Sequence, residues 1–144
     1  KSPQKTFDEQ WTYPYLSVCA TGTHDTSTLR GWWEEDRTMS ERFFHEILHC
    51  DGTAPYFCEP WICERIVNQH LNSPSMLCVL PLQDWMSIDG EVRYQGKPED
   101  ERINIPAIPR HYWRWRMHIT LEDLLSRTDF NRTIHDLISD SGRG

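Results

Sequence analysis

An adjacent imidazole and carboxylate, His24 and Asp25, are the first side chains in this sequence that could do chemistry. They follow an apolar run over residues 15–21 that ends in small residues, a pattern typical of a buried parallel strand. Because such strands present functional side chains at their carboxyl ends, the pair predicts a site there. One carboxylate makes neither a glycosidase nor an aspartic protease, since both need a second one. The alternative is a loop aspartate that caps the next helix beside a hydrogen-bonded histidine.

His45, Glu46 and His49 spell the HExxH motif of zinc metalloproteases. On a helix, histidines four residues apart share a face and could hold one zinc ion, with the glutamate as general base. The position of the third histidine is Pro55, which has no donor atom, and the next glutamates stand closer than a zinc protease would place its ligand. The motif therefore favours an amphipathic helix whose histidines face solvent or cap neighbours. A small zinc metalloprotease is the rival enzyme.

The composition limits the possible partners. The chain has 144 residues, enough for one domain with a core, and its 15 basic and 22 acidic residues leave a formal net charge of −7. This acidic excess argues against nucleic acid and anionic membranes as the main partner. Seven tryptophans suit core packing, and they also suit sugars, whose C–H faces lie flat on aromatic rings.

Five cysteines, an odd number without CxxC spacing, lie mostly in apolar stretches. This pattern predicts a reduced protein with buried thiols and a cytoplasmic location. The longest apolar run, residues 76–82, is too short to cross a bilayer. The chain begins at Lys1 without an initiator Met or a signal segment, so we expect a piece of a longer protein.

Two apolar runs with a helical pattern between them indicate a parallel β–α–β unit. Residues 15–21 and 76–82 are predicted strands, and residues 59–71 repeat apolar side chains at helical spacing. Another helix is expected over residues 41–49, with Ser40 as its N-cap. Two parallel strands cannot bury both of their faces alone, so this α/β chain is expected to be part of a larger sheet.

The C-terminal third contains a long loop and two predicted helices. Residues 89–109 are rich in charge and proline, which indicates a loop. Thr120 begins a capping box for a helix that reaches residue 127, and a last helix is expected over residues 131–139.

Several motifs together resemble the 4-alpha-glucanotransferases of glycoside hydrolase family 77. They are THDTSTLRGWWEED (23–36), QHLNSPSML (69–77), LPLQDWM (80–86), ERINIP (101–106) and HYWRWR (111–116). The double tryptophan with its acidic residues, and the closing SGR, are closest to the long form of the family, the plant disproportionating enzyme 2 type. The resemblance implies a (β/α)₈ TIM barrel of which residues 1–144 are the C-terminal part, with strands seven and eight and no second domain.

The resemblance also implies a retaining transfer of glucosyl units between alpha-1,4-glucans, such as maltose and maltodextrin, without a cofactor or metal. Asp25 matches a carboxylate that stabilises the transition state, and His24 matches a histidine that binds the same sugar. The nucleophile and the acid/base group are expected on the rest of the barrel, upstream. This piece is therefore expected to be inactive by itself.

Three further side chains are candidates for substrate binding. Gln83 and Asp84 follow the second predicted strand and could line the donor pocket, or they could be structural. Trp32 could stack on glucan or pack against its own loop. A non-catalytic glucan-binding fragment, dependent on tryptophans rather than carboxylates, is the second rival function.

Overall fold

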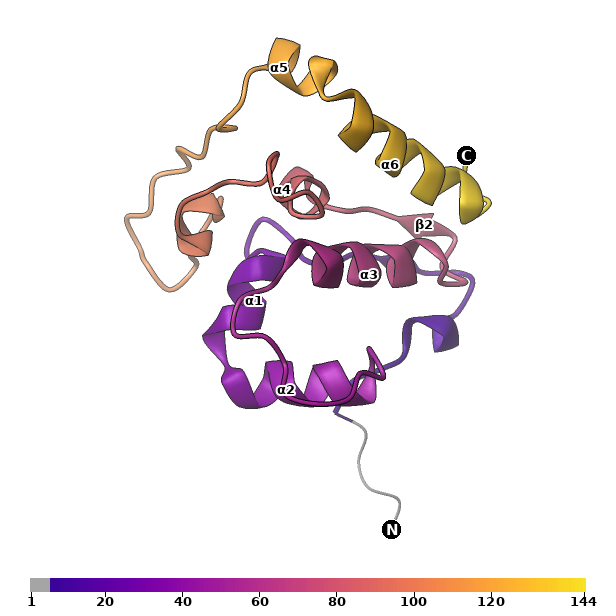
Figure 1. Ribbon diagram of the computed structural model, residues 1–144. Helices are drawn as coiled ribbons and strands as arrows, with labels where there is room; N and C mark the ends of the chain where they lie inside the picture. The colour runs from indigo at the N-terminus through magenta and orange to yellow at the C-terminus, as the bar shows by residue number, and fades with distance from the viewer. Residues whose placement is uncertain (1–5) are drawn as a thin grey trace.

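Helices and loops pack against one side of a short parallel sheet in the computed structural model, which describes residues 6–144 (Figure 1). Residues 1–5, which the prediction of one domain over 1–144 includes, lie outside the described residues. In chain order the elements are η1 (Gln10–Thr12), β1 (Val18–Cys19), α1 (Leu29–Glu35), α2 (Arg37–Glu46), α3 (Pro60–Leu71), β2 (Leu77–Cys78), α4 (Leu82–Met86), η2 (Pro98–Glu101), α5 (Leu121–Ser126) and α6 (Thr128–Asp140).

The two strands pair in parallel, as the β–α–β pattern predicts. Val18 lies opposite Leu77, and Cys19 lies opposite Cys78. Each strand is only two residues long, so the predicted strands over 15–21 and 76–82 are too long. The second one ends before Pro81, which has no N–H to donate to a ladder and instead stands at the N-terminus of α4.

Only one side of this sheet is covered by the described chain. Cys19 is 5% exposed, and its thiol contacts the carbonyl of His70 in α3. By contrast, Val18 is 62% exposed and Leu77 is 52% exposed. The prediction of buried strands is therefore wrong for these side chains, because helices of this chain cover one face of the pair and no further strand pairs with it within residues 6–144.

The segment after β1 contains a helix that the sequence patterns did not predict. Thr28 caps α1 by accepting a hydrogen bond from the Gly31 N–H (3.2 Å). Asp36 then ends α1 and caps α2 by accepting from the Met39 N–H (3.1 Å). Ser40, the predicted N-cap, lies inside α2, which begins one turn earlier than predicted.

The core lies among the first three helices, and α6 closes it. Trp33 of α1 is 1% exposed, and α3 contributes several fully buried side chains, as its predicted periodicity requires. Phe130 of α6 reaches the same cluster. The predicted C-terminal helices are confirmed, with Thr120 accepting from the Asp123 N–H (3.1 Å) and α6 beginning earlier, at Thr128.

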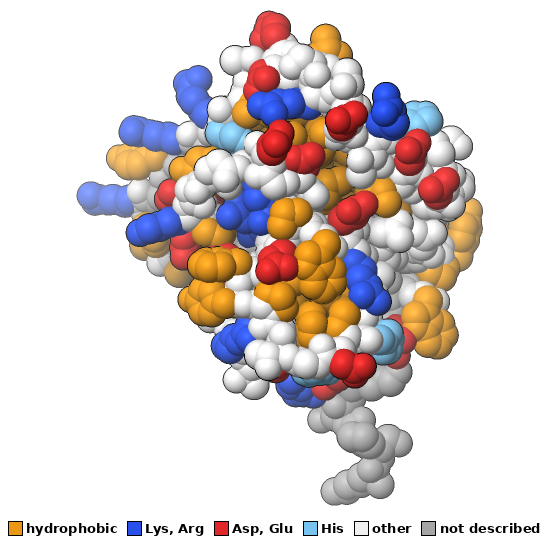
Figure 2. Space-filling view, in the orientation of Figure 1, with side chains coloured by type: hydrophobic (Ala, Val, Ile, Leu, Met, Phe, Trp, Pro, Cys, Tyr) orange, Lys and Arg blue, Asp and Glu red, His pale blue; other side chains and the backbone are white. Residues whose placement is uncertain are grey.

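The five cysteines are free thiols, and Cys19, Cys58 and Cys63 are buried as predicted. None of the helices between residues 6 and 144 is long and apolar enough to span a membrane. On the face drawn in Figure 2, charges of both signs are interspersed with groups of hydrophobic side chains.

Candidate functional site

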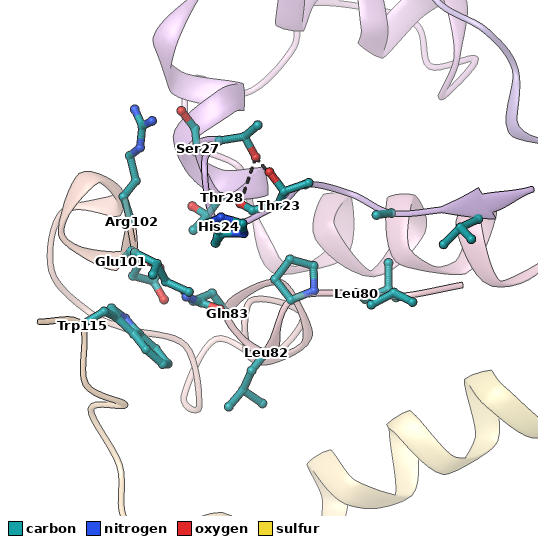
Figure 3. Close-up of a pocket in the computed structure, with 17 residues that line it drawn as sticks. Thr23, His24, Ser27, Thr28, Leu80, Leu82, Gln83, Glu101, Arg102 and Trp115 are labelled. Carbon is teal, nitrogen blue, oxygen red and sulfur yellow. Dashed lines mark hydrogen bonds between the residues drawn. The ribbon is translucent and has the colours of Figure 1, made fainter. Parts of the chain in front are cut away.

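A cleft of about 620 Å³ lies beside the carboxyl end of β1. Its walls come from the exposed side of the strand pair (Val18 and Val79), the loop after β1, the turn into α4, the end of η2 and the ring of Trp115 (Figure 3). Parallel sheets place ligands at this end of their strands. Of the predicted site residues, His24 and Gln83 line the cleft.

The loop that carries His24 makes a tight turn before it reaches α1. A Cβ at Gly22 would lie 2.9 Å from the Thr26 hydroxyl oxygen, so the turn needs a residue without a side chain there. The Thr26 hydroxyl accepts from the Thr23 N–H (2.9 Å) and donates to the Thr23 carbonyl (3.1 Å). These bonds hold the backbone in position around His24.

Asp25 lies next to the cleft, and the side chain of Asn104 holds its carboxylate. Its Oδ1 accepts a hydrogen bond from Asn104 Nδ2 at 2.6 Å and lies 3.4 Å from His24 Nε2. The side chains of His24 and Asp25 are 55% and 49% exposed, so both can meet a ligand. The Trp113 ring, 5.6 Å from the His24 ring between centroids, adds an aromatic surface.

Gln83 and Glu101 form one wall of the cleft, near Trp115 (Figure 3). The Gln83 amide donates to the Glu101 carbonyl oxygen (3.2 Å). Glu101 is 2% exposed and pairs with Arg30 (3.3 Å). Burial raises the pKa of Glu101 to about 7, although Arg30 opposes the shift. This carboxyl therefore gains or loses its proton near neutral pH.

Asp84 lies beneath the cleft rather than in its wall. It has no exposed surface, it accepts from the Leu29 N–H at the start of α1 (2.9 Å), and it accepts from the Thr21 hydroxyl. Burial raises the pKa of Asp84, and these two hydrogen bonds oppose the rise. The structural interpretation of Asp84 thus agrees with its position, because a fully buried carboxylate in this loop–helix junction has no free path to a sugar.

Trp32 faces away from the cleft. Its ring packs edge-on against Phe7 and Phe43, with centroids 6.2 Å and 5.3 Å apart. It lines a separate cavity of about 340 Å³ instead. Packing, the second of the two predicted roles, accounts for these contacts.

The HExxH residues do not form a metal site. The helix expected over residues 41–49 ends at Glu46, and His49 has a positive φ of 53°, so the two histidines do not share a helical face. His45 contacts the Cys50 carbonyl through Nδ1 (2.8 Å) and lies 3.4 Å from Glu41. Across residues 6–144, no group of three His, Cys, Asp or Glu side chains is placed to hold a metal ion. The geometry thus disfavours the zinc protease.

Residues 101–104 and Trp115 are the contributors to this region that the residue patterns alone did not single out. They come from the loop predicted over 89–109 and from the segment after it, far along the chain from His24. The motifs ERINIP and HYWRWR contain them, so the family resemblance was the signal available.

Known proteins are similar to this chain in fold and in sequence. The amylomaltase from Streptococcus agalactiae, solved in complex with acarbose, superposes with a TM-score of 0.66 and 21% identity, over 92% of this chain and 23% of that one. The two proteins therefore have the same fold over this region. The profile of glycoside hydrolase family 77, described as 4-alpha-glucanotransferase, matches residues 1–122.

The chain belongs to glycoside hydrolase family 77, the 4-alpha-glucanotransferases. The 4-alpha-glucanotransferase DPE2 of rice (Oryza sativa subsp. japonica) is 43% identical over 132 residues, which are 91% of this chain and 14% of the rice protein. The chloroplastic/amyloplastic 4-alpha-glucanotransferase of Solanum tuberosum is 29% identical over 100 residues, 69% of this chain and 15% of that protein. The chain thus spans a small part of the length of these relatives.

Proposed function

We propose that this chain is the last quarter of the catalytic (β/α)₈ barrel of a 4-alpha-glucanotransferase, with β1 and β2 as strands seven and eight. The exposed apolar side chains in and next to the two strands support this assignment. Leu16 is 81% exposed, Val18 62% and Val79 59%, and apolar side chains of this kind gain stability when further strands and helices cover them. The rest of the barrel is then the protein partner of this surface.

The proposed reaction transfers a glucosyl unit from maltose or maltodextrin to a glucan acceptor with retention of configuration. A carboxylate attacks the anomeric carbon while a carboxylic acid protonates the leaving sugar oxygen, so the glycosidic bond breaks as a covalent glycosyl–enzyme forms. The acceptor hydroxyl then attacks the same carbon, gives its proton to the acid/base group and releases the enzyme carboxylate. Both groups are expected outside residues 1–144.

His24 and Asp25 are proposed to hold the sugar whose anomeric carbon reacts. Their hydrogen bonds to its hydroxyls would strengthen as the ring flattens towards the oxocarbenium ion, which lowers the barrier selectively. The observation that carries this proposal is the position of the pair: half exposed, beside a cleft at the carboxyl end of a parallel strand, in a chain of this family. Gln83 is proposed to contact the donor from the opposite wall.

The test is disproportionation of maltotriose, followed as release of glucose and longer maltodextrins. We expect turnover by the full-length polypeptide that carries this chain, and none by residues 1–144 alone. A full-length protein that binds maltotriose without turnover would instead support the glucan-binding fragment. Turnover by residues 1–144 alone would show that the missing carboxylates are not required, which contradicts the proposal. A cytoplasmic location is a separate prediction, to be checked by imaging the tagged full-length protein.

A further inference from the structure

The ERINIP segment has no role in the function proposed so far, although it lies against the candidate site. Its first residue is a firm anchor. The Glu101 carboxylate is buried and lies 3.3 Å from the guanidinium of Arg30 in α1. The backbone carbonyl of Glu101 accepts a hydrogen bond from the side-chain amide of Gln83 in α4 (3.2 Å). Two helices therefore fix the start of the segment in place.

From this anchor the segment reaches across to the loop after β1. Arg102 donates to the Asp25 carbonyl (3.3 Å), and the Asn104 N–H donates to the His24 carbonyl (3.1 Å). The Asn104 side chain then donates to Asp25 Oδ1 at 2.6 Å. Three hydrogen bonds thus hold the backbone of His24 and Asp25 and the carboxylate of Asp25. The residues that each bond joins are 77 to 80 positions apart in the sequence.

The third bond matters most for chemistry. Asp25 is in an exposed loop, where a carboxylate would otherwise rotate freely about its two side-chain torsions. A charge-assisted hydrogen bond to one oxygen restricts the rotation of the group and leaves the other oxygen for a ligand. Neither Asp25 nor Asn104 lines the cleft, but the Asn104 amide is engaged by Asp25 Oδ1, so we place Asn104 behind the carboxylate rather than against a bound sugar.

We propose that Asn104 is a positioning residue for the Asp25 carboxylate, holding Oδ1 so that Oδ2 meets the sugar hydroxyls in the transition state. This inference rests on the proposed function of Asp25. Such preorganisation raises kcat more than it changes KM, because the ground-state sugar binds without the full strength of these contacts.

A double-mutant cycle in the full-length enzyme, with maltotriose as substrate, tests the coupling. Asn104→Ala and the size-matched Asn104→Asp should each lower kcat about 10-fold or more, with KM changed less than about twofold. On an Asp25→Ala background, neither substitution should lower kcat further, because no side-chain oxygen remains at position 25 for Asn104 to position. The matched control is Asn72→Ala, at the end of α3, where Asn72 bonds only to Asn68 among described side chains and kcat should be unchanged.

The outcomes separate the two proposals. If the unsubstituted full-length enzyme does not turn over maltotriose, the proposed function fails and this inference fails with it. If it does, but the losses from Asp25→Ala and Asn104→Ala multiply, Asn104 acts independently of Asp25 and only the positioning role is overturned. Thermal unfolding of each variant is measured alongside. If Asn104→Ala does not fold, Asn104→Asp carries the cycle, and an unchanged kcat in that variant also overturns the positioning role.

Discussion

Replacing Asp84 is the sharpest test of how this region is built. In Asp84→Ala, the buried Leu29 N–H loses its acceptor, and the Thr21 hydroxyl loses its own. A buried donor without an acceptor lowers the free energy of unfolding by about 1–3 kcal/mol. The loss from the Thr21 hydroxyl is smaller, because this group is partly exposed and can rotate to bond with water. With the small cavity that the deletion leaves, we expect a loss of about 3 kcal/mol in the free energy of unfolding.

Asp84→Asn is the matched control. Its side-chain oxygen can still accept from the Leu29 N–H, while its amide donates to the Thr21 oxygen, whose hydroxyl turns around. Because burial raises the pKa of Asp84, removing the charge also relieves an unfavourable desolvation. We therefore expect Asp84→Asn to stay within about 1 kcal/mol of the unsubstituted protein.

Urea unfolding followed by tryptophan fluorescence gives both values, since Trp33 is buried in the core. A loss of about 3 kcal/mol should also lower the unfolding temperature by about 9 °C in a protein of this size. Equal losses in the alanine and asparagine variants would refute the argument from hydrogen bonds. A raised KM for maltotriose in the full-length enzyme that carries Asp84→Asn, without any loss of stability, would return Asp84 to the substrate-binding role.

Three further predictions concern other groups. Asp25→Asn in the full-length enzyme should lower kcat by roughly 100-fold or more while leaving the unfolding temperature unchanged; a near-normal kcat would make Asp25 an ordinary loop residue. Because burial raises the pKa of Glu101 from 4.5 to about 7, the folded state keeps this proton to higher pH than the unfolded chain does. Stability should therefore fall by about 3 kcal/mol between pH 4.5 and 7, a slope that Glu101→Gln should remove in pH-dependent urea titrations. Iodoacetamide should label the partly exposed Cys50 before Cys58, because burial excludes the reagent from Cys58 and raises the pKa of that thiol. Mass spectrometry of the native protein gives the order of labelling, and labelling of Cys58 first would contradict this expectation.

Local patterns predicted much of the fold. The periodicity of α3 and the capping box at Thr120 identified α3 and α5 within a few residues, since these signals act over one or two turns, and the last helix, α6, was also predicted. Parallel pairing of the two strands was also predicted. The helix α1 was missed because its N-cap, Thr28, stands among several Ser and Thr residues that resemble a loop.

The candidate site was predicted in part. The position of His24 and Asp25 after a strand follows from the order of apolar and polar residues along the chain. The contacts of Asp25 with Asn104 do not, because they join positions 79 residues apart through a loop with no periodic pattern. The failure of the HExxH motif depends on the end of α2 at Glu46, which the spacing of histidines cannot reveal.

Asp25 and Asp84 show what the sequence by itself determined and what only the tertiary structure decided. Both carboxylates follow an apolar run, so the residue pattern places both near the carboxyl ends of two parallel strands, and the family motifs agree. Their burial depends on which elements pack over them. Asp84 is buried at the N-terminus of α1, where its Oδ1 accepts from the Leu29 N–H and its Oδ2 accepts from the Thr21 hydroxyl. Asp25 stays half exposed and is held by Asn104. Contacts between residues 55 and 79 positions apart in the sequence thus decide which carboxylate supports the fold and which one can reach a sugar.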